Sequence, residues 1–228
     1  MIPSKGLEMR TAVVAIALLV ALAAPVAAHG EEAPPPSAPP VPTVDELLTR
    51  LSALPGVEAR FREEKRIALL AAPLVSEGTI HFDPPGRLAR HTKSPARSSV
   101  VVREGALLFG DERGGDRIDL GSNPVVALFV ESFIAILAGD QAALERMYTV
   151  RIAPFGEGGW ELDLAPRLPR MRRILRQVTV RGEGVAIEQI SIVETSGDVT
   201  VTTFSDVDTA RRYGEAEERR IFSVPISR

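Results

Sequence analysis

Histidine is the first residue type to consider for chemistry, because an imidazole can act as a general base or a metal ligand near neutral pH. The chain has three histidines: His29 lies near the N-terminus, while His81 and His91 lie in two separate predicted strands. None has a partner at the spacing typical of a zinc site or a catalytic triad. We therefore predict a structural role for them, with no metal ligand and no cofactor.

Other catalytic patterns are also absent from the sequence. No Gly-x-Ser-x-Gly elbow, Walker motif or Rossmann glycine pattern occurs. The acidic residues Asp111, Glu112, Asp116 and Asp119 surround one predicted loop without the ligand spacing of a calcium loop, which favours a solvated turn. The chain has no cysteine, which excludes disulfides and thiol chemistry. A hydrolase with paired carboxylates is an alternative, but we predict that the protein is not an enzyme.

Arginine is concentrated between residues 167 and 176, where five arginines alternate with apolar residues at near-helical spacing. One interpretation is a solvated face, and the other is a dock for an acidic partner or for lipid headgroups. Under the second interpretation, Arg170, Arg172 and Arg173 are the predicted partner-docking residues. The net charge of the whole chain is −3, which argues against nucleic acid as a partner.

The N-terminal residues have the three-part pattern of a secretory signal peptide. Lys5 and Arg10 precede an apolar run over residues 12–24, and Val26-Ala27-Ala28 fits a small-x-small cleavage site. The run is shorter than the roughly 20 residues that span a bilayer; a retained anchor is the alternative, and Met9 is an alternative start. We predict a signal peptide over 1–28, a proline-rich linker over 29–42 and a monomeric periplasmic domain over 43–228.

An amphipathic helix is expected at the start of this domain. Thr43-Val44-Asp45-Glu46 has the form of a capping box, and leucines follow at spacings of three and four before Pro55-Gly56. The next segments alternate apolar and polar residues at hairpin spacing, which predicts an antiparallel meander. Its predicted strands are 57–62, 74–82, 88–92, 99–103, 106–109 and 117–120, with a polar loop over 110–116.

The pattern becomes helical after Asn123. The run Val125–Leu137 is apolar on nearly all sides and ends at Gly139, which predicts a helix that is buried or lies in an apolar groove. A core helix and a lid over a ligand are both compatible with that pattern. Asp140 is expected to cap a short second helix over 141–147. Further strands are predicted over 148–154, 159–164, 177–181, 186–194, 198–204 and 221–224.

Several short motifs follow one another along the domain. They are Phe61-x-x-x-Lys65, Pro73-Leu74-Val75-Ser76-x-Gly78, Phe82 with Leu88-x-Arg90, Pro95, Gly139-Asp140, Trp160-x-Leu162-x-Leu164-x-Pro166 and Gly197-Asp198. Their order and spacing resemble the outer-membrane lipoprotein carrier (LolA) family, and most of all a divergent LolA-like branch. The resemblance implies a mainly β (α+β) fold: a strongly curved antiparallel half-barrel with helices covering its concave face. One departure is Asp83 or Pro84 where the well-studied carriers place an arginine.

The resemblance also implies a function. It indicates a periplasmic carrier or chaperone that shields the acyl chains of a lipoprotein or other lipidated cargo on the way to the outer membrane. The implied partners are this cargo, an inner-membrane exporter and an outer-membrane acceptor; a lipid-sensing envelope-stress regulator of similar fold is the alternative. Strand parity and the apolar helix give the predicted lipid-binding residues, which are Phe61, Ile80, Phe82, Leu88, Val100, Val102, Leu108, Phe129, Phe133, Ile136 and Leu137.

Overall fold

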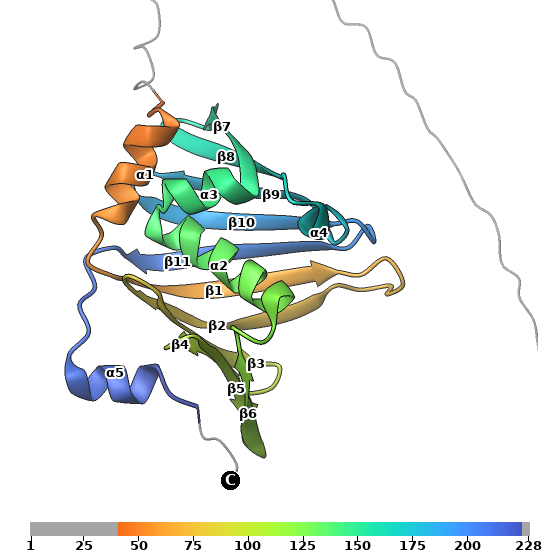
Figure 1. Ribbon diagram of the computed structural model, residues 1–228, viewed down its shortest axis with the longest axis vertical. Helices are drawn as coiled ribbons and strands as arrows, with labels where there is room; N and C mark the ends of the chain where they lie inside the picture. The colour runs from red at the N-terminus through yellow and green to blue at the C-terminus, as the bar shows by residue number, and fades with distance from the viewer. Residues whose placement is uncertain (1–40, 225–228) are drawn as a thin grey trace, which may run out of the picture. The chain divides into compact units, whose positions relative to one another are not determined.

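The computed structural model describes residues 41–224, so the predicted signal peptide and nearly all of the predicted linker lie outside the described residues. The described chain is mainly β: 11 strands form a single antiparallel sheet (Figure 1). No helix in this range is long and apolar enough to span a bilayer. The strands are β1 (Val57–Arg66), β2 (Leu74–Asp83), β3 (Arg87–Ser94), β4 (Ser98–Arg103), β5 (Ala106–Asp111), β6 (Gly114–Asp119), β7 (Tyr148–Phe155), β8 (Gly159–Pro166), β9 (Leu175–Glu183), β10 (Ala186–Glu194) and β11 (Val199–Asp208).

The first and the last strand of the chain, β1 and β11, lie side by side at the centre of the sheet. β1 pairs with β2 on one side and with β11 on the other, whereas β6 and β7 form the two outer edges. The strands β6 and β7 are neighbours in the chain, so the segment between them must cross the whole sheet. That segment contains two of the helices. The helices are α1 (Val44–Ser52), α2 (Pro124–Ala138), α3 (Gln141–Met147), α4 (Pro169–Arg172) and α5 (Glu215–Ile221).

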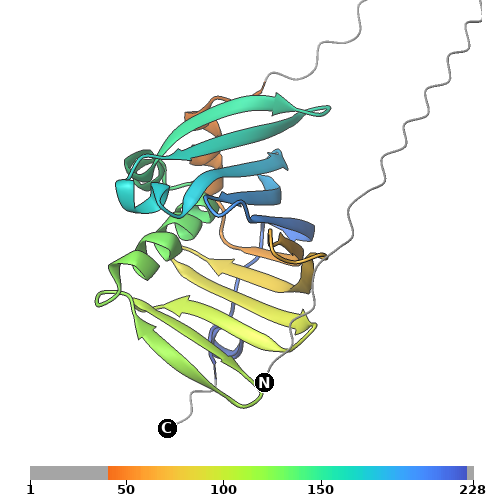
Figure 2. The ribbon, with the colours of Figure 1, turned by 90° about the vertical axis from the view of Figure 1, so that its right-hand side faces the viewer.

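The sheet is strongly curved and does not close, and α2 crosses its concave face (Figure 2). The predicted fold class, an open antiparallel half-barrel with helices on its concave face, is confirmed. Part of the curvature arises at Gly78, where the pairing of β2 with β3 shifts register. A Cβ at Gly78 would lie 2.0 Å from the carbonyl oxygen of His91, so only glycine permits this close approach of the two strands.

The predicted capping box is present at the start of α1. The Glu46 amide donates to the Thr43 hydroxyl at 3.2 Å, and the Thr43 amide donates to the Glu46 carboxylate at 2.8 Å. The hydrogen bond from the Thr43 amide to the carboxylate is the main reason that the pKa of Glu46 lies below its usual value. The apolar face of α1 is buried against the concave side of the sheet through Leu47, Leu48 and Leu51.

The C-terminal end of α2 packs directly against α1. Gly139 follows α2 in the left-handed conformation with φ of +60°, and its amide donates to carbonyl groups of the last turn. A Cβ at this position would lie 2.3 Å from the carbonyl oxygen of Leu48. Glycine is therefore required twice, by the backbone conformation and by the contact between the two helices.

The convex face carries a second, smaller apolar cluster that holds the C-terminal helix α5. Its members from the sheet are Ala89, Val101 and Leu108, and those from the C-terminal segment are Ile221, Phe222 and Val224. The prediction of a strand over 221–224 was wrong, because the acidic and basic residues before Ile221 form a helix whose last turn and exit residues provide the apolar anchors. The predicted loop over 110–116 was too long: β5 continues to Asp111 and β6 begins at Gly114.

The two described histidines lie beneath α5 on the convex face. His91 contacts the Ser99 hydroxyl through Nδ1 at 2.8 Å and the Ile221 carbonyl through Nε2 at 2.9 Å. His81 lies 3.5 Å from the Glu58 carboxylate and 5.7 Å, ring to ring, from His91. Burial lowers the pKa of both imidazoles. Their predicted structural role agrees with these contacts.

We expect Gly139→Ala to lower the free energy of unfolding by about 3 kcal/mol, because both the left-handed backbone and the contact with Leu48 are disturbed. Urea denaturation followed by the fluorescence of buried Trp160, the only tryptophan of the chain, measures the loss. Gly156→Ala is the matched control, since Gly156 has φ of +59° with no atom within 4 Å of the new Cβ. It should lose only about 1 kcal/mol; equal losses would contradict the proposed role of the helix contact.

We also expect stability to fall as the pH is lowered from about 7.5 to about 5.5. The folded protein binds a proton at His81 and His91 more weakly than the unfolded chain, whose histidines titrate near 6.5. Stability is therefore complete well above 6.5 and decreases as the pH falls through 6.5, until the pH reaches the lowered pKa of the folded state. Urea midpoints across this range measure the slope. His81→Gln combined with His91→Gln should remove most of it, and a flat wild-type profile would show that the prediction is wrong.

Candidate functional site

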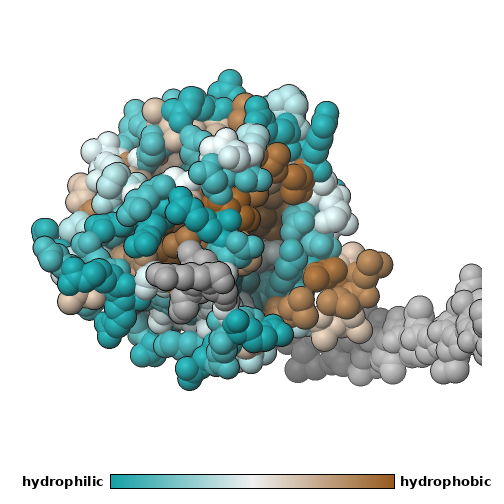
Figure 3. All heavy atoms as spheres, turned by 60° about the horizontal axis from the view of Figure 1, so that its bottom comes forward, coloured by the Kyte–Doolittle hydropathy of each residue, from teal (hydrophilic) through white to brown (hydrophobic). Residues whose placement is uncertain are grey.

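The concave face is built from alternate residues of neighbouring strands. In the register of β1 and β2, Val57 lies opposite Phe82 and Ala59 lies opposite Ile80. Residues directly opposite each other point to the same side of a sheet, and so do residues two apart on one strand. The concave side therefore receives every second residue of each strand, and most of these residues near the helices are apolar. Figure 3 shows apolar side chains gathered in a hollow among hydrophilic ones.

Most predicted lipid-binding residues lie on this side of the sheet or on α2. Phe61, Ile80, Phe82, Leu88 and Val102 are buried in one core cluster, together with Ile136 and Leu137 of α2. Phe129 and Phe133 are half-buried and pack against the same cluster. Val100 is half-buried and lies opposite Arg90, which lies opposite Ile80, so it also points to the concave side.

The placement of Leu108 was wrong. It lies opposite Val101 in the β4–β5 pair and belongs to the convex cluster beneath α5. Its neighbour Leu107 lies opposite Val102 and packs against the concave core instead. Alternation alone does not fix which set of β5 residues is concave, because a register shift of one residue moves every side chain to the other face.

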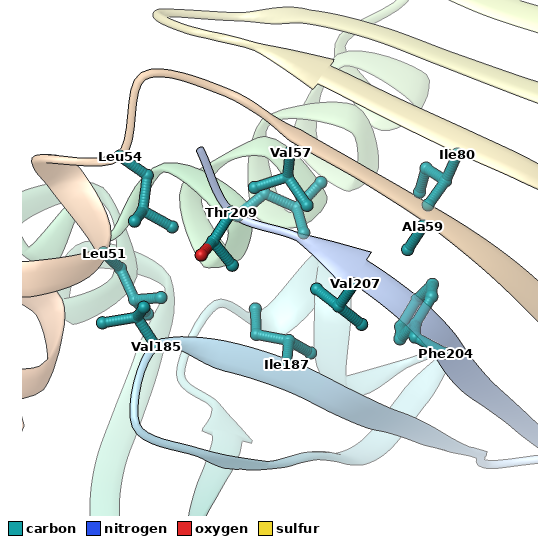
Figure 4. Close-up of a pocket in the computed structure, with 11 residues that line it drawn as sticks. Leu51, Leu54, Val57, Ala59, Ile80, Val185, Ile187, Phe204, Val207 and Thr209 are labelled. Atoms are coloured by element: carbon teal, nitrogen blue, oxygen red, sulfur yellow. The ribbon is translucent and has the colours of Figure 1, made fainter. Parts of the chain in front are cut away.

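A small cavity lies where α1, α2 and the central strands meet (Figure 4). Its volume is about 20 Å³, which is room for roughly one water molecule. Ligand pockets commonly have volumes of ~300–1,000 Å³, so the apolar interior is closed in this conformation. The cavity is lined by Leu51, Leu54, Val57, Ala59, Ile80, Leu137, Val185, Ile187, Phe204, Val207 and Thr209.

Several of these lining residues were not among the predicted ones. Leu51 and Leu54 belong to the apolar face of the first helix, and Ile187 and Phe204 belong to alternating strands. The periodicity of each segment was visible in the sequence. What the sequence did not indicate was that β11 returns to the centre of the sheet beside β1, which brings Phe204 next to Ala59 and Ile80.

The two halves of α2 are held to different extents. In the C-terminal half, Ser132 and Ala135 to Leu137 are buried, and the Ser132 hydroxyl lies 2.5 Å from the Tyr148 hydroxyl. Burial raises the pKa of Tyr148, so this hydroxyl keeps its proton. In the N-terminal half, Leu128 is the one buried residue that anchors the helix to the core, Val125 is 48% exposed, Phe129 is only half-buried and no side chain caps the first turn. The N-terminal half of α2 is thus the more weakly anchored part.

A polar group borders the apolar interior on the concave side. Arg90 donates through Nη2 to Glu63 at 3.0 Å and to Ser76 at 3.1 Å, and Thr202 donates to the other oxygen of Glu63 at 3.1 Å. The guanidinium of Arg90 lies 4.3 Å from the centre of the Phe61 ring. The side chains of Arg90 and Glu63 are 31% and 25% exposed, so the pair is reachable from solvent. The Arg90–Glu63 pair therefore lies where the apolar residues of the concave face give way to polar ones.

The predicted docking arginines lie on and just after α4, away from the core. Arg170 and Arg172 are exposed residues of α4, and exposed Arg173 follows it. The acidic residues around 111–119 lie at the β5–β6 hairpin, where Asp111 pairs with Arg113 at 2.9 Å. In the chain from residue 41 to residue 224, no three histidine or acidic side chains come together as a possible metal site.

Comparison with known proteins gives one family match. A family model described as "Outer membrane lipoprotein carrier protein LolA-like" matches residues 36–220, which is most of the chain. No curated protein matches the sequence.

Solved structures with a similar fold have low sequence identity to this chain. The LolA superfamily protein NE2245 from Nitrosomonas europaea is 12% identical, over 80% of this chain and 98% of its own, with a TM-score of 0.45. The Pseudomonas aeruginosa MucA/MucB complex gives 14% identity over 76% of this chain and 59% of the matched chain, with a TM-score of 0.47. A DUF1329 family protein from Desulfovibrio piger gives 10% identity, 78% and 97% coverage, and a TM-score of 0.43.

Proposed function

Because the chain belongs to the outer membrane lipoprotein carrier protein LolA-like family, we propose that it binds an acyl chain between α2 and the concave face of its sheet and carries the attached cargo across the periplasm. Its activity is binding and release, without catalysis. An acyl chain exposed to water costs about 0.8 kcal/mol for each CH₂ group, so transfer through an aqueous space needs a protein that covers it.

The observation that carries this proposal is the apolar α2 lying over an apolar sheet with its N-terminal half weakly anchored. In the closed conformation the cavity of about 20 Å³ is too small for an acyl chain. Binding therefore requires α2 to move outward, with its C-terminal end held by Gly139 against α1. The half-buried Phe129 and Phe133 then contact the chain in place of the sheet.

The polar part of the cargo has a place beside the acyl chain. An amphiphile whose chain lies on the concave face would have its first polar atoms at the Arg90–Glu63 pair. Arg90 uses only Nη2 in its hydrogen bonds to Glu63 and Ser76, so its other N–H groups can donate to an ester carbonyl or a phosphate. A lipoprotein or another lipidated product satisfies this chemistry.

The periplasm, an inner-membrane exporter and an outer-membrane acceptor belong to the same proposal. They rest on the predicted signal peptide and on the family description. A lipid-sensing regulator would bind a partner protein in response to lipid, whereas a carrier would release its lipid to acceptor membranes. Transfer of a labelled lipid from the protein to vesicles therefore separates the two functions.

We expect Phe133→Asp to weaken the binding of a fluorescent fatty acyl probe by about 2 kcal/mol, or roughly 30-fold, because it places a carboxylate against the acyl chain. Its effect on folding should be smaller, since Phe133 is only half-buried. Probe titration and urea denaturation measure the two effects. Native mass spectrometry of protein purified from its own periplasm should also detect co-purified acylated material.

Leu108→Ala provides the matched control for this variant. Leu108 is 4% exposed but lies on the convex side, so its truncation should cost about 3 kcal/mol of stability and leave probe affinity unchanged. If both variants lost affinity in proportion to stability, α2 would be only a core helix. If wild-type protein neither bound the probe nor co-purified with lipid, the carrier function would be refuted.

We also expect a disulfide between Gly86→Cys and Ile134→Cys to block uptake of the probe. A Cβ at Gly86 would lie 4.0 Å from Cγ2 of Ile134, and the chain has no other cysteine. The bond would tie α2 to the β2–β3 turn at Ile134, one turn before the end of the helix, so that α2 could not swing outward about Gly139. Oxidised protein should bind the probe at least about tenfold more weakly than reduced protein, and the two single-cysteine variants should not respond to oxidation. Equal binding in both redox states would show that α2 need not move.

A further inference from the structure

The loop between β1 and β2 presents leucines to solvent. The Leu70 amide donates to the Ile67 carbonyl at 2.9 Å, which forms a tight turn with Ala68 and Leu69 at its tip. Leu69 is 94% exposed, Leu70 48% and Leu74 53%. A single exposed leucine is ordinary, but three on one hairpin form an apolar projection.

Two other segments lie beside this loop. The Ala68 amide donates to the carboxylate of Asp198 in the β10–β11 turn at 3.1 Å. Thr195 in the same turn donates through its amide to the Ile174 carbonyl at 2.9 Å and through its hydroxyl to the Arg173 carbonyl at 2.8 Å. The loop, the turn and the end of α4 thus form one end of the sheet, at the right of Figure 1.

This end of the sheet is both apolar and basic. We call it the leucine–arginine end, and it consists of Leu69, Leu70, Leu74, Ile174, Arg170, Arg172 and Arg173. The three arginines are exposed, and within residues 41–224 none of them forms an ion pair. The buried Met171 fixes α4 to the sheet, so the arginines stay on its outer side. The positive charge is local, because the chain as a whole carries −3.

We propose that the leucine–arginine end docks onto an anionic lipid bilayer. Leucines at a narrow tip can enter the boundary between headgroups and acyl chains, and arginines beside them can bind lipid phosphates. A protein partner would instead need a broad complementary surface, whereas this feature is a projection, visible as the apolar group at the right of the coloured atoms in Figure 3. The proposal does not depend on which cargo the protein carries, or on whether it carries one.

Docking in this orientation would bring the end of the sheet next to the membrane and leave α1 and the opposite strand ends away from it. The strands β1 and β10 both end at the docked side. From there, the concave side of the sheet extends towards the Arg90–Glu63 pair. A lipid leaving the bilayer would thus meet this end of the concave face first.

Vesicle sedimentation tests the proposal with the wild-type chain and variants that share its N-terminus, so that differences report on the substituted residues alone. We expect wild-type protein to bind phosphatidylglycerol-containing vesicles more tightly than pure phosphatidylcholine vesicles. Leu69→Ser with Leu70→Ser should weaken that binding about tenfold, and Arg172→Gln with Arg173→Gln should remove the preference for the anionic lipid.

Two matched controls lie elsewhere on the surface. Phe155→Ser changes an apolar residue that is 43% exposed at the β7–β8 hairpin, and Arg219→Gln with Arg220→Gln changes two adjacent exposed arginines of α5. Neither should alter vesicle binding. The proposal is overturned if wild-type protein does not prefer anionic vesicles, or if the leucine variant binds them as the wild type does.

A direct measurement of insertion uses the absence of cysteine in the chain. Leu69→Cys carries a single environment-sensitive fluorophore, whose emission should shift to shorter wavelength with phosphatidylglycerol vesicles. The same label at Phe155→Cys should keep its emission in water. A label at position 69 that stays water-exposed on vesicle-bound protein would contradict insertion of the loop. The protein would then bind the vesicle through another surface.

Discussion

The passage of the chain from β6 to β7 is the constraint on which the rest of the fold depends. These strands are the opposite edges of one sheet and yet are consecutive, so their connection must cross the full width of the sheet. It crosses on the concave side, where a helix must be apolar to pack. The apolar character of α2 is thus required by topology before any ligand is considered. The same crossing makes α2 the element that must move if an acyl chain is to enter.

The two faces of the sheet have different roles because successive residues of each strand point to opposite faces. Leu107 and Val102 face the concave core, while Leu108 and Val101 face α5 on the other side. Large, closely packed side chains on the concave side leave only a cavity of about 20 Å³. The convex side instead holds imidazoles beneath α5: His81 is buried, and half-buried His91 contacts the Ile221 carbonyl at 2.9 Å.

Local signals predicted most of the elements, and long-range pairing explains what they missed. The capping box at Thr43 and the terminating Gly139 are short-range patterns, and both were read correctly from the sequence. The face of Leu108 depends on a register that is set by pairing with β4, which no local pattern reveals. The 221–224 segment resembled a strand because its apolar residues anchor a helix end.

The central seam between β1 and β11 has a consequence for how this chain folds. Each half of the sheet is a meander of sequence neighbours, and such local contacts form quickly. At the seam, Phe61 pairs with Phe204. β1 therefore gains its second neighbouring strand only after almost the whole chain has been synthesised. Before that, one long edge of β1 is open to pairing with other chains. The sheet therefore reaches its native arrangement only when β11 completes its middle.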